Sequence, residues 1–89
     1  MIQQELKIIN RLGIHARPAA LIAQTAANFV CEIKLIKDNI SVDAKSIMGV
    51  RMLAAECGSS VQVITKGADE KEAADALKNL FENKFNEEF

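Results

Sequence analysis

The chain has 89 residues, of which 49% are hydrophobic and 26% charged, a balance typical of one small globular domain and unlike that of a disordered tail. Its 11 basic and 12 acidic residues give a net charge of −1, so no overall positive field attracts nucleic acid. No apolar stretch approaches the roughly 20 residues that span a bilayer, and the first residues lack the pattern of a signal peptide. We therefore expect a single cytoplasmic, monomeric domain over residues 1–89, without nucleic-acid binding or membrane insertion.

The first part of the chain predicts a strand followed by a helix. Apolar and polar residues alternate from Ile2 to Ile8, as in a half-buried strand. The segment Gly13–Ala19 then contains the only histidine and the only proline of the chain. From Ala16 to Phe29, apolar residues recur at spacings of three and four, which predicts a helix. His15 is therefore expected at the N-cap of that helix.

A histidine at a helix start can be a simple polar cap, but the neighbours of His15 favour phosphoryl chemistry. The first-turn amides of Ala16 and Arg17 have no internal partner and would bind an anion attached to His15, and Arg17 would add a permanently charged clamp. Pro18 suits the first helical turn, and Gly13 permits a tight turn before it. A neutral imidazole is a good nucleophile towards phosphorus, and we expect the cationic surroundings to keep His15 neutral.

The sequence predicts a phosphoryl carrier rather than a stand-alone enzyme. No P-loop, carboxylate cluster or second general base accompanies the histidine, so we expect no metal, no cofactor and no nucleotide hydrolysis. Such a protein must receive phosphate from one protein and give it to another. Cys31 and Cys57 lack metal-binding spacing and are expected to be reduced, partly buried thiols.

The middle of the chain predicts a hairpin and a short helix. Residues Cys31–Leu35 and Ile40–Asp43 alternate in polarity and flank turn-forming residues. Ser46 is a preferred N-cap for an apolar segment that runs to Ala55, with Gly58 as a C-terminal stop.

One face of this second helix has two possible roles. Ile47, Met48 and Arg51 can share that face, which either packs in the core or contacts partners, and burial of Met48 would favour the core. Leu53 is the candidate for the core-facing side. Gly49 is unfavourable inside a helix, which indicates close approach of another backbone or of a partner.

The last part of the chain predicts a strand at residues 61–65 and a third helix. Asp69 and Glu72 have the spacing of a capping box at the start of that helix. Its expected buried stripe consists of Ala73, Leu77, Leu80, Phe81 and Phe85. Residues 86–89 are expected to fray. Together the elements predict an α+β open-faced β-sandwich, βαββαβα, in which three helices cover one face of a four-stranded antiparallel sheet.

The segments Gly13–Ala19 and Lys45–Val50 resemble those of HPr, the histidine-containing phosphocarrier family of the bacterial phosphotransferase system, and the resemblance extends over essentially the whole chain. It implies that Nδ1 of His15 accepts a phosphoryl group from enzyme I and passes it to IIA domains of sugar-specific enzymes II. Arg17 would balance the charge of that group.

The same resemblance implies a docking surface and a regulatory site. The docking surface comprises Ala20, Gln24, Ile47 and Met48, to which Arg51 adds a charge. Ser46 resembles the site that an HPr kinase/phosphorylase modifies, and it can serve as an N-cap at the same time.

Two alternatives stay open from the sequence. Leu12 replaces a small hydroxylated residue common before the motif glycine, and residues 10–13 together with Phe81 and Phe85 resemble the nitrogen-related branch of the family, which relays phosphate to regulatory proteins. A different interpretation takes the same order of elements as a ferredoxin-like small-ligand module in which His15 is incidental.

Overall fold

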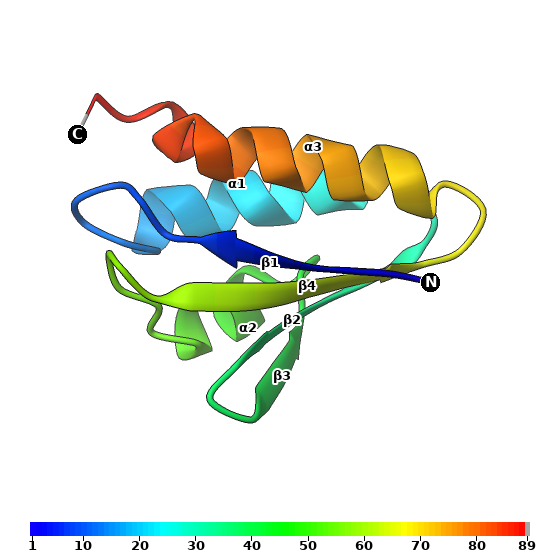
Figure 1. Ribbon diagram of the computed structural model, residues 1–89, viewed down its shortest axis with the longest axis horizontal. Coiled ribbons are helices and arrows are strands. Elements are labelled where there is room, and N and C mark those ends of the chain that lie inside the picture. The colour runs from blue at the N-terminus through cyan, green and yellow to red at the C-terminus, as the bar shows by residue number, and fades with distance from the viewer. Residues whose placement is uncertain (89) are drawn as a thin grey trace.

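The computed structural model describes residues 1–88 as a four-stranded antiparallel sheet with three α-helices. The strands are β1 (Ile2–Lys7), β2 (Glu32–Lys37), β3 (Ile40–Asp43) and β4 (Ser60–Lys66). The helices are α1 (Ala16–Ala27), α2 (Ile47–Met52) and α3 (Glu70–Glu82), followed by a short 3-10 turn, η1 (Lys84–Asn86). The predicted order βαββαβα and the α+β open-faced architecture are confirmed (Figure 1).

The sheet has the strand order β1-β4-β2-β3, and each neighbouring pair is antiparallel. Strand β4 pairs with both β1 and β2, with Leu6 opposite Val61 and Leu35 opposite Val63. These four side chains are buried on one face, and their neighbours along each strand point to the other face because side chains alternate. The sheet therefore has one apolar face, which the helices cover.

The helices pack through most of the apolar residues that the sequence predicts, although Phe85 lies in η1, beyond the end of α3, because its backbone is left-handed. Helices α1 and α3 lie side by side over the sheet, and α2 packs against α1 and next to β3 (Figure 1). Ile22 and Ala26 of α1 are fully buried, as is Leu77 of α3. The Phe81 ring meets that of Phe85 edge to face, with 4.9 Å between centroids. Within residues 1–88, no helix is long and apolar enough to cross a membrane.

Two predicted helix ends were wrong. Helix α1 ends two residues before the predicted Phe29, and α2 ends at Met52 rather than at Ala55. Ala54 adopts a left-handed conformation with φ of +49°, which a continuing helix does not permit. Gly58 lies in the turn before β4 and does not terminate α2.

The predicted capping box of α3 does not form. Asp69 is the N-cap residue of α3, but its side chain makes no capping hydrogen bond. Its carboxylate instead accepts from the amides of Val30, at 2.9 Å, and Cys31, at 3.0 Å. The bond from Val30 is the main cause that lowers the pKa of Asp69. Asp69 therefore ties the start of α3 to the start of β2, because those amides need an acceptor at the end of the sheet.

Candidate functional site

Gly13 fixes the loop that leads into α1. Its φ is +69°, and a Cβ atom there would lie 2.6 Å from the carbonyl oxygen of Ala55 and 2.9 Å from Cα of Glu56. The amide of Ile14 donates to that same Ala55 oxygen at 2.9 Å. The loop is thus held directly against the segment that follows α2, and only glycine fits at this approach.

His15 is the N-cap residue of α1, as predicted. Its backbone is extended, and its side chain makes no capping hydrogen bond. The side chain is 36% exposed, so a partner protein can reach it. Because Pro18 has no N–H and the first-turn amides of Ala16 and Arg17 have no acceptor within the helix, the imidazole stands beside donors that are free to bind an anion.

A carboxylate that the sequence interpretation missed contacts the His15 ring. Nε2 of His15 lies 2.9 Å from Oε2 of Glu87, whose side chain is only 8% exposed. The other oxygen, Oε1, accepts from Nδ2 of Asn10 at 2.8 Å. Nη1 of Arg17 lies 4.0 Å from Oε2. The expected purely cationic surroundings of His15 were wrong, because Glu87 places a negative charge beside the ring.

The donors around Glu87 favour its ionised form. The hydrogen bond from the Asn10 amide is the largest cause that lowers the pKa of Glu87, and the contacts with His15 and Arg17 act in the same direction. Burial opposes them because it disfavours the charged form. Glu87 is therefore an anion that Asn10 holds against the histidine.

The expectation that residues 86–89 fray is wrong for the described part of that segment, and Phe89 lies outside the described residues. Lys84, Phe85 and Asn86 all have positive φ, between +54° and +63°, which reverses the chain after α3. Phe85 is fully buried, and the Glu87 amide donates to the Lys84 carbonyl at 3.0 Å. The C-terminal segment consequently lies at the same end of the molecule as the loop before α1 (Figure 1).

This site agrees with a comparison against known families. Residues 2–83 match the family model described as "PTS HPr component phosphorylation site". The chain belongs to the HPr family. HPr proteins are phosphocarriers of the phosphotransferase system, and that coarse function applies to this chain. The match favours the phosphocarrier interpretation over a ferredoxin-like small-ligand module.

Individual HPr proteins resemble the chain over its whole length. The phosphocarrier protein HPr of Cupriavidus necator is 53% identical over 87 residues, covering 98% of both chains. That of Treponema pallidum is 50% identical over 88 residues, covering 99% of this chain and 100% of the relative. The crystal structure of an HPr from Thermoanaerobacter tengcongensis superposes with a TM-score of 0.96, at 47% identity and full coverage of both chains.

Ser46 and Gly49 form the start of α2 together. The Ser46 hydroxyl oxygen accepts from the Gly49 amide at 3.0 Å, which confirms the predicted N-cap. A Cβ atom on Gly49 would lie 3.3 Å from Oγ of Ser46 and 3.4 Å from Cβ of Val42. Among the described residues, side chains and not another backbone therefore lie closest to Gly49. The approach of a partner at Gly49 stays a prediction.

The exposed face of α2 is apolar. Ile47 is 45% exposed and Met48 and Met52 are each 70% exposed, so the core-packing alternative for Met48 was wrong. Arg51 is also exposed. Leu53 is 3% exposed and packs in the core, as predicted.

The α1 members of the predicted docking surface lie on the neighbouring helix. Gln24 is exposed and Ala20 is partly buried. Since α1 and α2 pack against each other, the structure brings the two predicted docking segments onto adjacent helices. Helix α1 begins directly after the Gly13 loop, whereas α2 is followed by the segment that contacts this loop.

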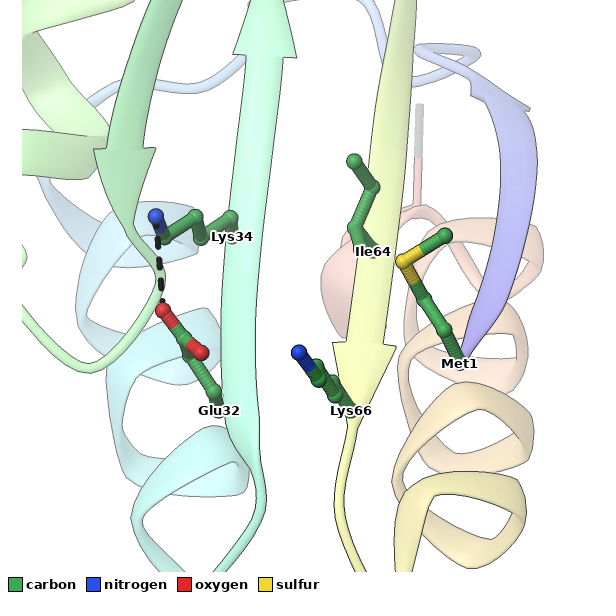
Figure 2. Close-up of a pocket in the computed structure, with 5 residues that line it drawn as sticks. All are labelled: Met1, Glu32, Lys34, Ile64 and Lys66. Atoms are coloured by element: carbon green, nitrogen blue, oxygen red, sulfur yellow. Dashed lines mark ion pairs between the residues drawn. The ribbon is translucent and has the colours of Figure 1, made fainter.

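A shallow depression on the uncovered sheet face is separate from this site. Figure 2 shows its lining residues, Met1, Glu32, Lys34, Ile64 and Lys66. Lys34 and Glu32, both on β2, form an ion pair at 3.3 Å along one side of it. The depression lies where β1 begins, whereas the His15 loop follows the other end of β1, so it shares no group with the histidine site.

Proposed function

We propose that this chain accepts a phosphoryl group on Nδ1 of His15 from the phosphohistidine of enzyme I and passes it to IIA domains of sugar-specific enzymes II. The observation that carries the proposal is the partly exposed His15 side chain at the N-cap of α1, which makes no capping bond to the first-turn amides. Membership of the HPr family supports it.

The chemistry requires little beyond this geometry. The Nδ1 lone pair of His15 forms a P–N bond while the P–N bond of the donor phosphohistidine breaks, and that electron pair returns to the donor imidazole. The amides of Ala16 and Arg17 and the guanidinium of Arg17 would bind the phosphoryl oxygens. A charge at a helix terminus is worth roughly 0.3–1 kcal/mol when exposed and up to about 2 kcal/mol when partly buried. Such stabilisation holds the group without trapping it.

Incubation with phosphoenolpyruvate and enzyme I tests the acceptor. We expect a single acid-labile phosphate that is absent from His15→Ala and retained in Ser46→Ala, with both variants shown to be folded by circular dichroism. Labelling that survives in His15→Ala would contradict the assignment of His15.

We further propose that the exposed apolar face of α2 docks both partners together with part of α1. This surface consists of Ala20, Gln24, Ile47, Met48 and Arg51. Exposed apolar side chains beside charged ones are typical of surfaces that bind proteins, and a flexible methionine suits more than one partner. Arg51 adds a positive charge that would select acidic partner surfaces.

Ser46 is proposed as a regulatory phosphorylation site for an HPr kinase/phosphorylase. Its side chain is exposed at the start of α2, next to Ile47 and Met48. A phosphate there would add negative charge to the proposed docking surface. We expect it to slow phosphoryl transfer from enzyme I, and unchanged transfer kinetics after complete serine modification would count against this role.

The recipients downstream define the remaining alternative. The nitrogen-related branch, which residues 10–13 together with Phe81 and Phe85 resemble, would pass phosphate to regulatory proteins. Transfer rates to a IIA domain of a sugar permease and to a nitrogen-regulatory IIA protein, measured side by side, separate the two roles. The monomeric state stays a prediction, which light scattering at several protein concentrations measures.

A further inference from the structure

The contact between His15 and Glu87 determines where the imidazole proton lies. An ionised carboxylate only accepts hydrogen bonds, so the ring nitrogen that approaches Glu87 at 2.9 Å, Nε2, must carry a hydrogen. A neutral imidazole has one N–H and one lone pair. The lone pair of neutral His15 is therefore on Nδ1, the nitrogen that faces away from Glu87.

Asn10 locks the carboxylate in place. The Asn10 side chain is fully buried, and its Nδ2 donates to the Gly13 carbonyl and to Oε1 of Glu87, both at 2.8 Å. Because both partners are acceptors, the amide cannot be turned around without losing both bonds. Glu87 thus has two fixed donors, one for each of its oxygens: Asn10 on Oε1 and His15 on Oε2.

We propose that Glu87 is a positioning residue for phosphoryl transfer, which accepts the Nε2 proton of His15 and so keeps the Nδ1 lone pair available for attack on phosphorus. This inference rests on the proposed function of His15. The arrangement follows the logic of a carboxylate that orients a catalytic imidazole and selects its tautomer.

The same contact suits each stage of the transfer. When the Nδ1 lone pair forms the P–N bond, the Nε2 proton stays on the ring, and the imidazole gains positive charge that faces the Glu87 carboxylate. When the phosphoryl group leaves for an acceptor imidazole, the P–N electron pair returns to Nδ1 and the neutral ring is restored with the same proton on Nε2. Arg17 lies 4.0 Å from the same carboxylate oxygen, so Glu87 also holds a cation near the reacting histidine.

The backbone conformation that places Glu87 beside His15 is energetically unfavourable. Three consecutive non-glycine residues, Lys84 to Asn86, have left-handed φ values, and each such residue costs roughly 1–2 kcal/mol. Strain of this kind persists only where the surrounding structure determines it, and it concentrates at functional sites. Here the fully buried Phe85 anchors the turn, and Glu87 is the side chain that the turn brings back to His15.

Glu87→Gln tests the proposal because it keeps the shape and changes one acceptor into a donor. Because Nδ2 of Asn10 is a hydrogen-bond donor with a fixed position, the side-chain oxygen of Gln will face Asn10. The NH2 group of that side chain will then face Nε2 of His15. An NH2 group there requires a lone pair on Nε2, and the proton moves to Nδ1. Glu88→Gln is the matched control, since Glu88 is exposed and is the next residue in the chain.

Two measurements are made on wild type and both variants. NMR chemical shifts of the ring nitrogens report the His15 tautomer, and rapid-quench kinetics report phosphoryl transfer from enzyme I. We expect wild type and Glu88→Gln to carry the proton on Nε2, and Glu87→Gln to carry it on Nδ1 and to transfer about 10- to 100-fold more slowly, as when other carboxylates that orient histidines are removed. Far-ultraviolet circular dichroism verifies that each variant is folded.

The outcomes separate this inference from the proposed function. If wild type is phosphorylated on His15 and Glu87→Gln shows either the same tautomer or the same transfer rate, the positioning role of Glu87 is overturned while the acceptor role of His15 stands. If wild type carries no phosphate on His15, the proposed function itself fails.

Discussion

Replacement of Gly13 by alanine should destabilise the chain strongly, because two separate effects coincide at this residue. An L-residue at φ of +69° costs roughly 1–2 kcal/mol. The new Cβ would also lie 2.6 Å from the carbonyl oxygen of Ala55, so a backbone segment must move, and overpacking of this kind typically costs about 1–3 kcal/mol. The expected loss in the free energy of unfolding is therefore about 2–5 kcal/mol.

Gly58→Ala provides the matched comparison. Gly58 also has a positive φ, of +92°, but a Cβ atom there would meet nothing within 4 Å. It should show only the conformational part of the loss. The difference between the two variants in the free energy of unfolding in urea gives the steric part, which should be about 1–3 kcal/mol. Thermal unfolding should show a lower Tm for Gly13→Ala than for Gly58→Ala, by about 4–8 °C for each kcal/mol.

Equal destabilisation of the two variants would refute the idea that the Gly13 loop is held against Ala55 by close approach. The same loop carries His15, whose amide donates to the Gly13 carbonyl at 3.1 Å. Where Gly13→Ala is still folded at low temperature, we therefore also expect slower phosphoryl transfer than in Gly58→Ala.

Three further predictions concern stability and docking. The bond from the Val30 amide is the main cause of the lowered pKa of Asp69. Its stabilising effect is therefore present above the unfolded-state pKa of about 3.9 and is lost as the pH falls through the lower folded-state pKa. Asp69→Asn should lose less stability than wild type during an acid titration, and identical titrations would contradict this. Ser46→Ala removes the N-cap of α2 and should lower the free energy of unfolding in urea by about 1 kcal/mol, whereas no change would show that the cap is dispensable. Met48→Ala, at a side chain 70% exposed, should change the free energy of unfolding by less than about 0.5 kcal/mol but raise the KM of enzyme I for this chain. Val50→Ala, at a fully buried side chain, should instead lower the free energy of unfolding by roughly 2 kcal/mol. An unchanged KM for Met48→Ala would argue against docking by α2.

Features that depend on neighbours along the chain were predictable from the sequence. The alternation in β1 and the apolar stripe of α1 indicate which faces are buried, because the periods of strands and helices are properties of local backbone geometry. The N-cap positions of His15 and Ser46 also follow from local signals, since a cap satisfies the amides of the next turn. Even there the end of α2 was predicted wrongly, because residues 53–55 are apolar, and Leu53 and Ala55 are buried, although none of the three is helical.

By itself, the sequence therefore determined the elements, their apolar faces and a histidine at the start of α1. Only the tertiary structure decided where two carboxylates act. Asp69 has the spacing of a capping box but binds amides at the start of β2. Glu87 is one of two adjacent glutamates, yet it contacts a residue 72 positions away. The physical reason is that these carboxylates bind donors far away in the chain, which come within hydrogen-bonding distance only after the helices have packed on the sheet.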